Sequence, residues 1–421
     1  MTSVVAGRGP AIDPSARNTA VLVGFTAITN LADGALKVAL PLIAASMTTS
    51  PSLVSGVLLT LTLPWVFAAL HVGVLVDRRD RRTLLWVANG VRVAVVGGFL
   101  AAMALEAFSL PLIYVGGILL GLAEVIALTS AAALVPSAVS PSLRERANAW
   151  LTGAETVCNE FVGPFVGGLL VAIGAAFALG ATVAGYLLTA ATLVLLAGRF
   201  RAAAKEGQPS RSVHQQIGDG LRFLWRERLL RVMTLVVAAL NTCWGAWLAL
   251  MPLYATKVMG LPVSRYGLLV GALGLGGLTG TMIMSVSTRL FGRRYVMFAN
   301  VVLTFALVAI PAVTANVWAV GLGAFLGGVG GGLWVVNSRT VSQILVPGDM
   351  LGRYSSASRM FGWGAVPVGA GLSGVLAEWF GFSVSFAFFS LATVLVIVPF
   401  ARVFTPAVQA EVEAKVSIDR V

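Results

Sequence analysis

Four carboxylic acids lie deep inside long apolar stretches of this sequence, where ionisable side chains are costly to insert into a membrane. All four fall in the first half of the chain, at Asp33, Glu124, Glu155 and Glu160. The second half has no comparable acid in the middle of an apolar stretch. A buried carboxyl without a full set of partners can exchange a proton near neutral pH. We therefore predict that the first half handles protons.

The basic neighbours of these acids leave a structural interpretation open. Lys37 follows Asp33 by four residues, so the two could form an ion pair along one face of a helix. Arg92 could do the same for Glu124 or for Glu155. Acids held in this way would stabilise the fold instead of exchanging protons.

Helical spacing also makes a prediction about the two glutamates of the same apolar stretch. Glu155 and Asn159 are four residues apart, so both can face one cavity, whereas Glu160 is turned about 140° away from Glu155. At most one of the two glutamates is then expected to point straight into a central cavity.

The second half carries embedded residues of another kind, namely aromatic rings beside a few polar groups. Aromatic faces with a small number of polar groups suit a bulky, largely apolar ligand. A single tryptophan can equally well pack between helices or anchor at the membrane surface. The predicted substrate-cavity residues are Asn241, Trp244, Trp334, Asn337, Arg339, Arg359 and Trp363.

The elements that position these residues follow from the composition. Only 11% of the 421 residues are charged and the mean hydropathy is +0.91, whereas soluble domains have about 25% charged residues. Apolar runs long enough to cross about 30 Å of hydrocarbon recur along the whole chain. We predict an all-α integral membrane protein with twelve transmembrane helices, near 20–46, 52–76, 83–105, 111–135, 147–173, 176–199, 229–256, 264–289, 294–315, 317–345, 352–378 and 382–404.

The longest polar stretch of the chain separates these helices into two sets of six. Within it, Leu221, Leu224 and Trp225 recur at helical spacing among arginines, which is typical of an amphipathic helix at a membrane surface. The predicted organisation is a six-helix half at 1–200, a cytoplasmic linker at 201–228, a second six-helix half at 229–405 and a cytoplasmic tail at 406–421.

The formal charge of +12 has a topological explanation. Basic residues gather in alternate connections between helices, while the intervening connections hold only Lys257 and Arg265. Because Lys and Arg accumulate in loops that remain in the cytoplasm, both termini are expected there, and the composition suggests a bacterial inner (plasma) membrane. The basic residues do not form one face, so no nucleic-acid partner is expected.

Several other classes of function are disfavoured. Two cysteines in apolar runs and two histidines cannot build a disulfide framework or a repeated metal site. No phosphate-binding Gly-x-x-x-x-Gly-Lys-Ser/Thr loop is present, and no nucleophile, base and orienting group can be assembled. We expect no metal, no cofactor and no enzymatic activity, and the sequence gives no indication of an oligomeric state.

The chain also resembles itself. The segment RERANAWLTGAETVCNEFVGPFVGGLLVAIG, from Arg144, aligns with LGRYSSASRMFGWGAVPVGAGLSGVLAEWFG, from Leu351, when Arg146 is set on Arg353 and Gly167 on Gly374. The aligned segments are about half a chain apart. Two parallel, pseudo-symmetric halves are the architecture of transporters that rock about a site at the middle of the membrane.

The sequence resembles the major facilitator superfamily over nearly its whole length. GVLVDRRDRR is similar to the helix 2/3 signature of that superfamily, Gly-x-Leu-Ala-Asp-Arg-x-Gly-Arg-Arg. Val76 replaces the Ala of the signature and Asp80 replaces its second Gly. The matching positions are Gly73, Leu75, Asp77, Arg78, Arg81 and Arg82.

A second motif lies in the fifth predicted helix. GPFVGG, which contains Gly163, Pro164, Gly167 and Gly168, matches the end of the antiporter signature Gly-x-x-x-Gly-Pro-x-x-Gly-Gly, with Asn159 in place of its first Gly. The combination of ADGALKVALPL, LGLAEVI, ANAWLTGAE and LGRYSSASRM is most similar to the twelve-helix branch that contains enterobactin-type siderophore exporters and multidrug efflux pumps.

The resemblance implies two mechanical roles. Asp77 would face the start of the eleventh helix, near Gly352, and would latch the cytoplasmic side closed, while Arg78, Arg81 and Arg82 hold the turn at the membrane surface. The glycines of GPFVGG would meet those of GALGLGGLTG at an extracellular seam between the halves. A bulky substitution at Gly167 is expected to hold that seam apart.

These observations predict a proton-coupled antiporter that exports a small amphipathic molecule, a drug or a secondary metabolite, by alternating access. Its partners would be the substrate, protons and membrane lipids. Two alternatives stay open. One is a facilitator or proton symporter that imports a small solute, and the other is a lipid-handling protein without coupled transport.

Overall fold

The computed structural model describes residues 14–196, 213–347, 350–410 and 414, and it contains helices but no β-strand within these ranges. Eleven helical stretches are long and apolar enough to cross a membrane. The first half comprises α1 (Pro14–Met47), α2 (Pro51–Thr62), α3 (Pro64–Phe67), α4 (Ala69–Arg78), α5 (Arg81–Ala104), α6 (Leu110–Ala138), η1 (Pro141–Leu143), α7 (Arg144–Glu155), η2 (Thr156–Val162), α8 (Gly163–Ile173) and α9 (Ala175–Val194). The remainder comprises α10 (Val213–Arg226), α11 (Arg228–Leu253), η3 (Tyr254–Val258), α12 (Val263–Phe291), α13 (Arg293–Val313), α14 (Val317–Leu345), α15 (Leu351–Phe380) and α16 (Phe382–Val403).

The second crossing differs from the single helix expected at 52–76. It is divided into α2, α3 and α4, with junctions at Leu63 and Ala68. Pro64 explains the first junction, because proline has no N–H to bond to the carbonyl of Thr60 and its ring crowds that carbonyl. With this segmented crossing, the fold has the twelve passages that the sequence predicts.

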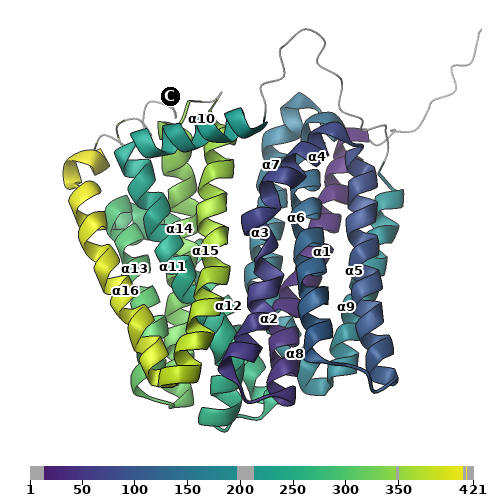
Figure 1. Cartoon of the computed structure of the whole chain (residues 1–421). Helices are drawn as coiled ribbons and strands as arrows, with labels where there is room; N and C mark the ends of the chain where they lie inside the picture. Colours follow the sequence, from purple (N-terminus) through teal and green to yellow (C-terminus); the bar gives the residue numbers. More distant parts are fainter. Residues whose placement is uncertain (1–13, 197–212, 348–349, 411–413, 415–421) are drawn as a thin grey trace, which may run out of the picture.

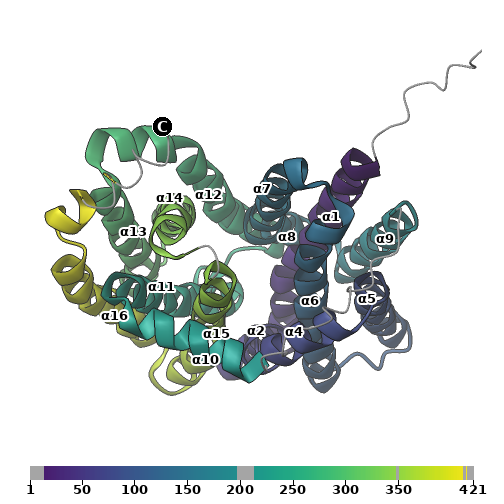
Figure 2. The same cartoon turned by 90° about the horizontal axis from the view of Figure 1, so that it is seen from above.

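The two sets of helices stand side by side, α1 to α9 in one half and α11 to α16 in the other (Figures 1 and 2). At one end of the molecule α10 lies across the ends of the helices of the second half (Figure 1). We call this end, which also carries the turn between α4 and α5, the linker face. The opposite end, where α1 ends and α2 begins, is called the far face.

The helix α10 is fastened to the second half by its apolar side. Leu224 is buried in a cluster with Val346 and Tyr354. A side chain at Gly220 would collide with the backbone of Arg353, because its Cβ would lie 2.5 Å from the Arg353 carbonyl oxygen. The close approach of α10 to α15 therefore depends on a glycine.

The halves touch each other mainly through two pairs of helices. The helix α2 packs against α15, and α8 packs against α12. Some apolar clusters lie within one half, such as the one built on Leu22, Leu134 and Leu193 in the first half. Others cross between the halves, because Val38 packs in the cluster around Trp247 and Leu58 packs with Ala249 and Ala370. The contacts between the halves are therefore continuous with the apolar core.

Candidate ligand cavity

A cavity of about 430 Å³ lies between the two halves, a size typical of small-molecule sites. The first half contributes α1, α2 and the continuous stretch α7–η2–α8, and the second half contributes mainly α11, α14 and α15. The lining parts of α14 and α15, at 331–343 and 354–366, are the parts nearer the linker face. The cavity therefore extends from the middle of the molecule toward the linker face.

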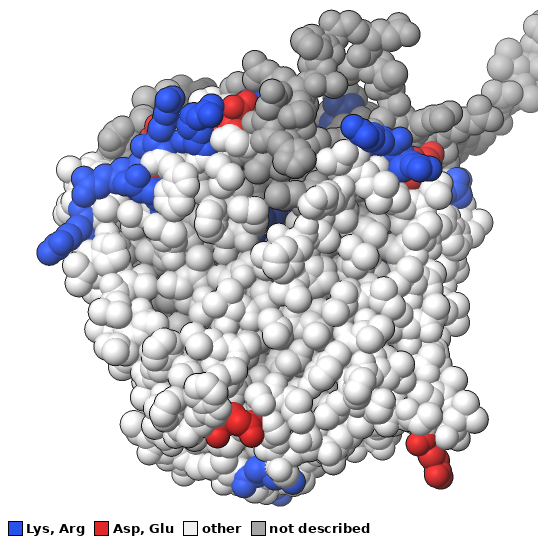
Figure 3. Space-filling model, in the orientation of Figure 1, with Lys and Arg blue, Asp and Glu red and all other residues white. Residues whose placement is uncertain are grey.

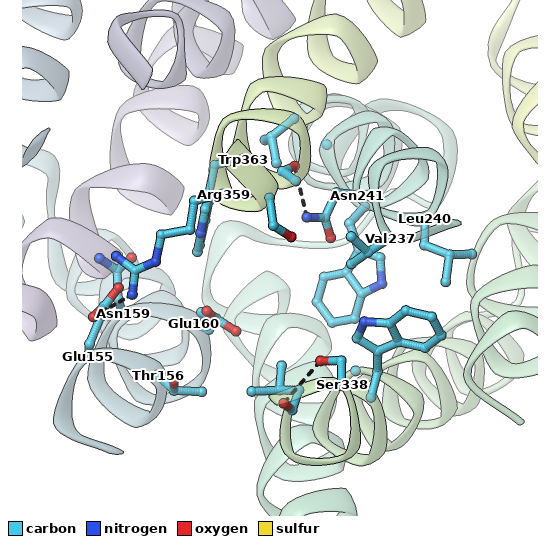
Figure 4. Close-up of a pocket in the computed structure, with 18 of the residues that line it drawn as sticks. Glu155, Thr156, Asn159, Glu160, Val237, Leu240, Asn241, Ser338, Arg359 and Trp363 are labelled. Carbon is cyan, nitrogen blue, oxygen red and sulfur yellow. Dashed lines mark hydrogen bonds and ion pairs between the residues drawn. The ribbon is translucent and has the colours of Figure 1, made fainter. Parts of the chain in front are cut away.

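A π-helical segment places the acidic residues of the cavity wall. Thr156–Val162 forms hydrogen bonds of the i to i+5 type, so residues five apart lie much closer in direction than on an α-helix. Glu155, Asn159 and Glu160 all line the cavity (Figure 4). The expectation that only one of the two glutamates faces the cavity was wrong, because it assumed α-helical spacing across this segment.

The charged side chains of the cavity wall are sparsely paired. Glu155 approaches Arg359 of α15, with 3.9 Å between its Oε2 and a guanidinium nitrogen (Figure 4). Glu160 forms no hydrogen bond or ion pair with any residue that the structure describes, and the same holds for Arg339 of α14. Of the predicted charged residues, Glu155, Glu160, Arg339 and Arg359 line the cavity.

Glu124 is held in a separate, buried network beside the cavity. Lys37 Nζ donates to Glu124 Oε1 at 2.8 Å and to Asn159 Oδ1 at 2.9 Å. Asn159 Nδ2 donates to Glu124 Oε1 at 2.9 Å and to Asn30 Oδ1 at 2.8 Å. The cation beside Glu124 is therefore Lys37, which differs from the alternative that Arg92 pairs with Glu124 or Glu155.

Asp33 lies outside the cavity lining, in a second buried network. It forms an ion pair with Arg92 and accepts a hydrogen bond from the Tyr186 hydroxyl at 2.7 Å. Arg92 also donates to Thr29 Oγ1 at 3.0 Å. The alternative pairing of Asp33 with Lys37 was wrong, because Lys37 extends toward Glu124 on α6 while Arg92 of α5 occupies the site beside Asp33.

The aromatic wall belongs mostly to the second half. Asn241 and Trp244 of α11, Trp334 of α14 and Trp363 of α15 line the cavity, as predicted. Asn337 does not. It is fully buried behind the wall, where its Oδ1 accepts a hydrogen bond from Arg293 at 3.1 Å. The prediction for Asn337 was wrong because helical spacing does not say which side of α14 faces the partner half.

Trp363 connects the aromatic wall to the first half. Its ring is stacked on that of Trp65 of α3, with 5.9 Å between ring centroids. Lys37 Nζ lies 5.7 Å from the centroid of the Trp363 ring, which is a cation–π distance. One indole therefore touches both the cavity and the cation that holds Glu124.

The charged turn between α4 and α5 is organised partly by its own residues. Asp80, which replaces the second Gly of the motif, caps the N-terminus of α5 by accepting a hydrogen bond from the Thr83 amide at 3.1 Å. Arg82 donates to the Leu193 carbonyl at 3.2 Å. Gly73 lies in α4, where an added Cβ would meet no described atom within 4 Å. The side chain of Asp77 and the surroundings of Gly352 lie outside what the structure describes, so the predicted latch contact stays a prediction.

The glycine motif of α8 serves two different contacts. A Cβ at Gly163 or Gly167 would collide with α1 of the same half, at 2.9 Å from Gly34 Cα and 2.3 Å from the Ala35 carbonyl oxygen. A Cβ at Gly168 would lie 2.7 Å from the Cα of Gly267, on α12 of the other half. The seam between halves therefore runs through Gly168, and the expectation for Gly167 was wrong because these neighbours face opposite partners.

A charged contact also joins α2 and α15, the second pair of helices that meet between the halves, at the far face. Glu378, near the end of α15, accepts hydrogen bonds from the Ser50 hydroxyl at 2.6 Å and from the Ser52 amide at 3.1 Å. Both serines lie at the start of α2, in the first half. A carboxylate of one half thus satisfies the N-terminus of a helix of the other half, where negative charge is favourable.

Comparison with known families decides the classification. The family model described as "Transmembrane secretion effector" (MFS_3) matches residues 17–420. The chain belongs to this family. The resemblance to the major facilitator superfamily and its efflux branch is thereby confirmed, and the protein is a multi-pass membrane transporter.

Two efflux proteins are similar to this transporter in sequence. The multidrug efflux pump Tap of Mycolicibacterium fortuitum is 27% identical over 401 residues, which are 90% of this chain and 94% of Tap. The enterobactin exporter EntS of Shigella boydii is 31% identical over 268 residues, which are 62% of this chain and 61% of EntS.

Solved structures share the fold of this transporter at low sequence identity. An inward-facing bacterial homologue of the iron transporter ferroportin superposes with a TM-score of 0.69 at 17% identity, over 92% of this chain and 98% of its own. An inward-facing, occupied bacterial homologue of the lysosomal transporter Spinster gives 0.70 at 12% identity, over 94% and 98%. Among the described residues, no group of three His, Cys, Asp or Glu side chains could hold a metal ion.

Proposed function

We propose that this transporter exports a small amphipathic molecule by proton-coupled antiport, and that Glu160 is the residue at which protons act. The observation that carries the proposal is a carboxyl group on the wall of the central cavity with no partner among the described residues. A carboxylate of this kind can bind either a proton or a cationic group of a ligand. Competition between the two at one site is what exchange transport requires.

The surroundings of Glu160 support this assignment. The charges that act on it are Glu155 of the same wall, Lys37 of α1, Arg359 of α15 and Arg339 of α14. Lys37 is engaged by Glu124, and Arg359 lies beside Glu155. Asp33 and Glu124, which the sequence also nominated, are each neutralised by a cation in the interior of one half. We assign them a structural role and keep Glu155 as the neighbour that modulates Glu160.

The orientation in the membrane completes the proposal. On the side of the molecule drawn in Figure 3, the Lys and Arg side chains gather mainly at the linker face. At the far face, η3 carries Lys257 and the first turn of α12 carries Arg265. By the positive-inside rule the linker face is cytoplasmic, so both ends of the chain are on the cytoplasmic side of a bacterial inner membrane. The cavity then opens to the cytoplasm, from which an exporter takes its substrate.

Reconstituted vesicles test the mechanism. The protein is placed in liposomes with an acidic lumen, and uptake of ethidium, fluorescein and ciprofloxacin is followed by fluorescence. These aromatic probes are cationic, anionic and amphoteric. We expect at least one to accumulate only when the lumen is acidic. Glu160→Gln should abolish accumulation, and Glu106→Gln, at an exposed acid away from the cavity, should retain it.

Other outcomes would contradict the proposal in distinct ways. Accumulation that requires an alkaline lumen would indicate proton symport and import. Movement of a probe that ignores the pH gradient would indicate an uncoupled protein, including one that handles lipids. Undiminished accumulation by Glu160→Gln would remove Glu160 from the mechanism while leaving antiport in place.

A further inference from the structure

The cavity presents two opposite charges, one from each half, that are both without a partner. Glu160 belongs to the π-helical segment of the first half, and Arg339 belongs to α14 of the second. Each lies within the electrostatic range of the other, yet no hydrogen bond or ion pair of 4 Å or less joins them. Cavity space therefore lies between a carboxylate on one wall and a guanidinium on the other.

Unpaired charges on the cavity wall favour a ligand with complementary charges. Arg339 is exposed and Glu160 is partly exposed, so water solvates both while the cavity is empty. A ligand that displaces this water must replace it with opposite charges or hydrogen bonds, because burying an ionic group is otherwise costly. The other acids of this region are engaged elsewhere, because Glu124 is bound by Lys37 and Asp33 by Arg92. Glu155 acts on Arg339 electrostatically, but its ion pair is with Arg359. The planar guanidinium presents donors in a fork that matches a carboxylate, and Glu160 offers an acceptor for an ammonium group.

Another part of the cavity wall suits a flat aromatic body. Trp244 and Trp334 line the same cavity as Arg339, together with Leu240. The Trp244 ring lies close against the backbone of α14 at Gly331, where an added Cβ would approach it to 3.1 Å. The absence of a side chain at Gly331 leaves an aromatic surface on the cavity wall, about 12 Å along α14 from Arg339.

We propose that the substrate is an amphoteric aromatic compound, whose acidic group binds Arg339 and whose ammonium group binds Glu160 across the cavity. This inference rests on the proposed function and deepens it. A proton and the ammonium group would compete for Glu160, while the acid holds the ligand to the other half. Glu155, Lys37 and Arg359 also act on Glu160, and Glu155 with Arg359 forms a second acid and base pair across the same gap. A ligand with both charges would bridge the two halves.

A set of three related fluorescent ligands tests the charge requirement. Ciprofloxacin carries an ammonium and a carboxylate near neutral pH, its N-acetyl derivative keeps only the carboxylate, and its methyl ester keeps only the ammonium. Binding to the full-length protein in lipid nanodiscs is measured by fluorescence anisotropy. We expect ciprofloxacin to bind at least about tenfold more tightly than either derivative, since a buried charge left unpaired loses about 1.4 kcal/mol or more.

Two variants assign each charge to its partner. In Arg339→Gln, ciprofloxacin should lose its advantage over the methyl ester but keep its advantage over the N-acetyl derivative. In Glu160→Gln the pattern should reverse, and Arg339→Lys should restore part of the preference for the carboxylate. Equal binding of all three ligands to the unaltered protein, or ratios that neither variant changes, would overturn the inference.

The result is independent of the transport experiment. If the unaltered protein does not distinguish the three ligands but still accumulates a probe under an acidic lumen, the amphoteric substrate is wrong and proton antiport stands. If the ligands are distinguished as expected but no probe responds to the pH gradient, the charge assignment stands and proton coupling is wrong.

Discussion

The interior of the first half and the region between the halves treat charge in opposite ways. Inside the first half, Asp33 and Glu124 are buried, each with a cation and further hydrogen-bond partners. Between the halves, Glu155 has one long contact to Arg359, and Glu160 and Arg339 have no partner among the described residues. The difference teaches that depth in the membrane alone does not identify a functional acid. A buried acid that is paired with a cation stabilises the interior of one half, whereas a charge on the cavity wall without a partner among the described residues is available to a ligand or a proton.

The largest expected effect comes from breaking a buried ion pair. Asp33→Asn leaves Arg92 buried without a counter-charge, and removal of one partner of a buried ion pair costs about 3–5 kcal/mol. We expect a loss of that size in the free energy of unfolding, measured by titration of detergent micelles with SDS. The double variant Asp33→Asn with Arg92→Gln should be more stable than Asp33→Asn alone. A single variant as stable as the unaltered protein would contradict the structural role.

A matched pair of glutamates sharpens the comparison. Glu124→Gln deprives Lys37 of its carboxylate and should lower the free energy of unfolding by about 1–3 kcal/mol. Glu160→Gln removes no contact with a described residue, so we expect a change within about 0.5 kcal/mol. The same SDS titration measures both. Equal losses would show that the two glutamates do not differ in the way described.

Two adjacent glycines separate contacts within a half from contacts between halves. Gly167→Val should crowd Ala35 and destabilise the protein by about 1–3 kcal/mol without changing the relation of the halves. Gly168→Val should crowd Gly267 and move the halves apart at the far face. Spin labels at Ile173→Cys and Val313→Cys, exposed positions near the far ends of α8 and α13, report that separation in a background without Cys158 and Cys243.

The two glycine variants should differ in the distance between the spin labels. Double electron–electron resonance should give longer distances for Gly168→Val and an unchanged distribution for Gly167→Val. Longer distances for Gly167→Val alone would contradict the structure and would show that Gly167 faces the other half, as the sequence suggested.

The smallest expected effect lies at the exposed contact of the far face. Glu378→Gln weakens the hydrogen bonds to Ser50 and Ser52, but contacts of exposed charged groups contribute only about 0.2–1 kcal/mol. We expect little change in the free energy of unfolding. The population of longer distances between the same spin labels should rise slightly. A large shift would show that this contact, more than the glycine seam, keeps the far face closed.

Much of the architecture could be predicted from the sequence. The apolar runs gave the crossings, and the motifs placed Asn159 and the glycines of α8 on the correct helix. Trp244, Trp334 and Arg359 were nominated because polar and aromatic residues embedded in apolar stretches mark cavity surfaces, and they line the cavity of the structure. Their contact with a substrate stays a prediction. Tyr186 and Asn30 carry the same signal and could have been recognised as partners of the acids.

The remaining features depend on relations between helices. Lys37 is one turn from Asp33, yet its side chain reaches Glu124 on another helix, and spacing within one helix cannot reveal this. The π-helical segment adds a residue to a turn, which turned Glu160 toward the cavity against the α-helical pattern. Which of Gly167 and Gly168 faces the other half depends on how α8 is rotated, and one residue changes that direction by about 100°.

The meeting point of α8 and α12 has a kinetic consequence. At Gly168 and Gly267 the main chains of α8 and α12 meet directly, and about one turn further along the Phe165 ring of α8 lies against Gly271 of α12. Parting the two helices therefore withdraws an aromatic side chain from the surface of α12, while the glycine contact itself requires no change of rotamer. A methyl group at Gly168 would add a second side chain that has to be withdrawn before water enters.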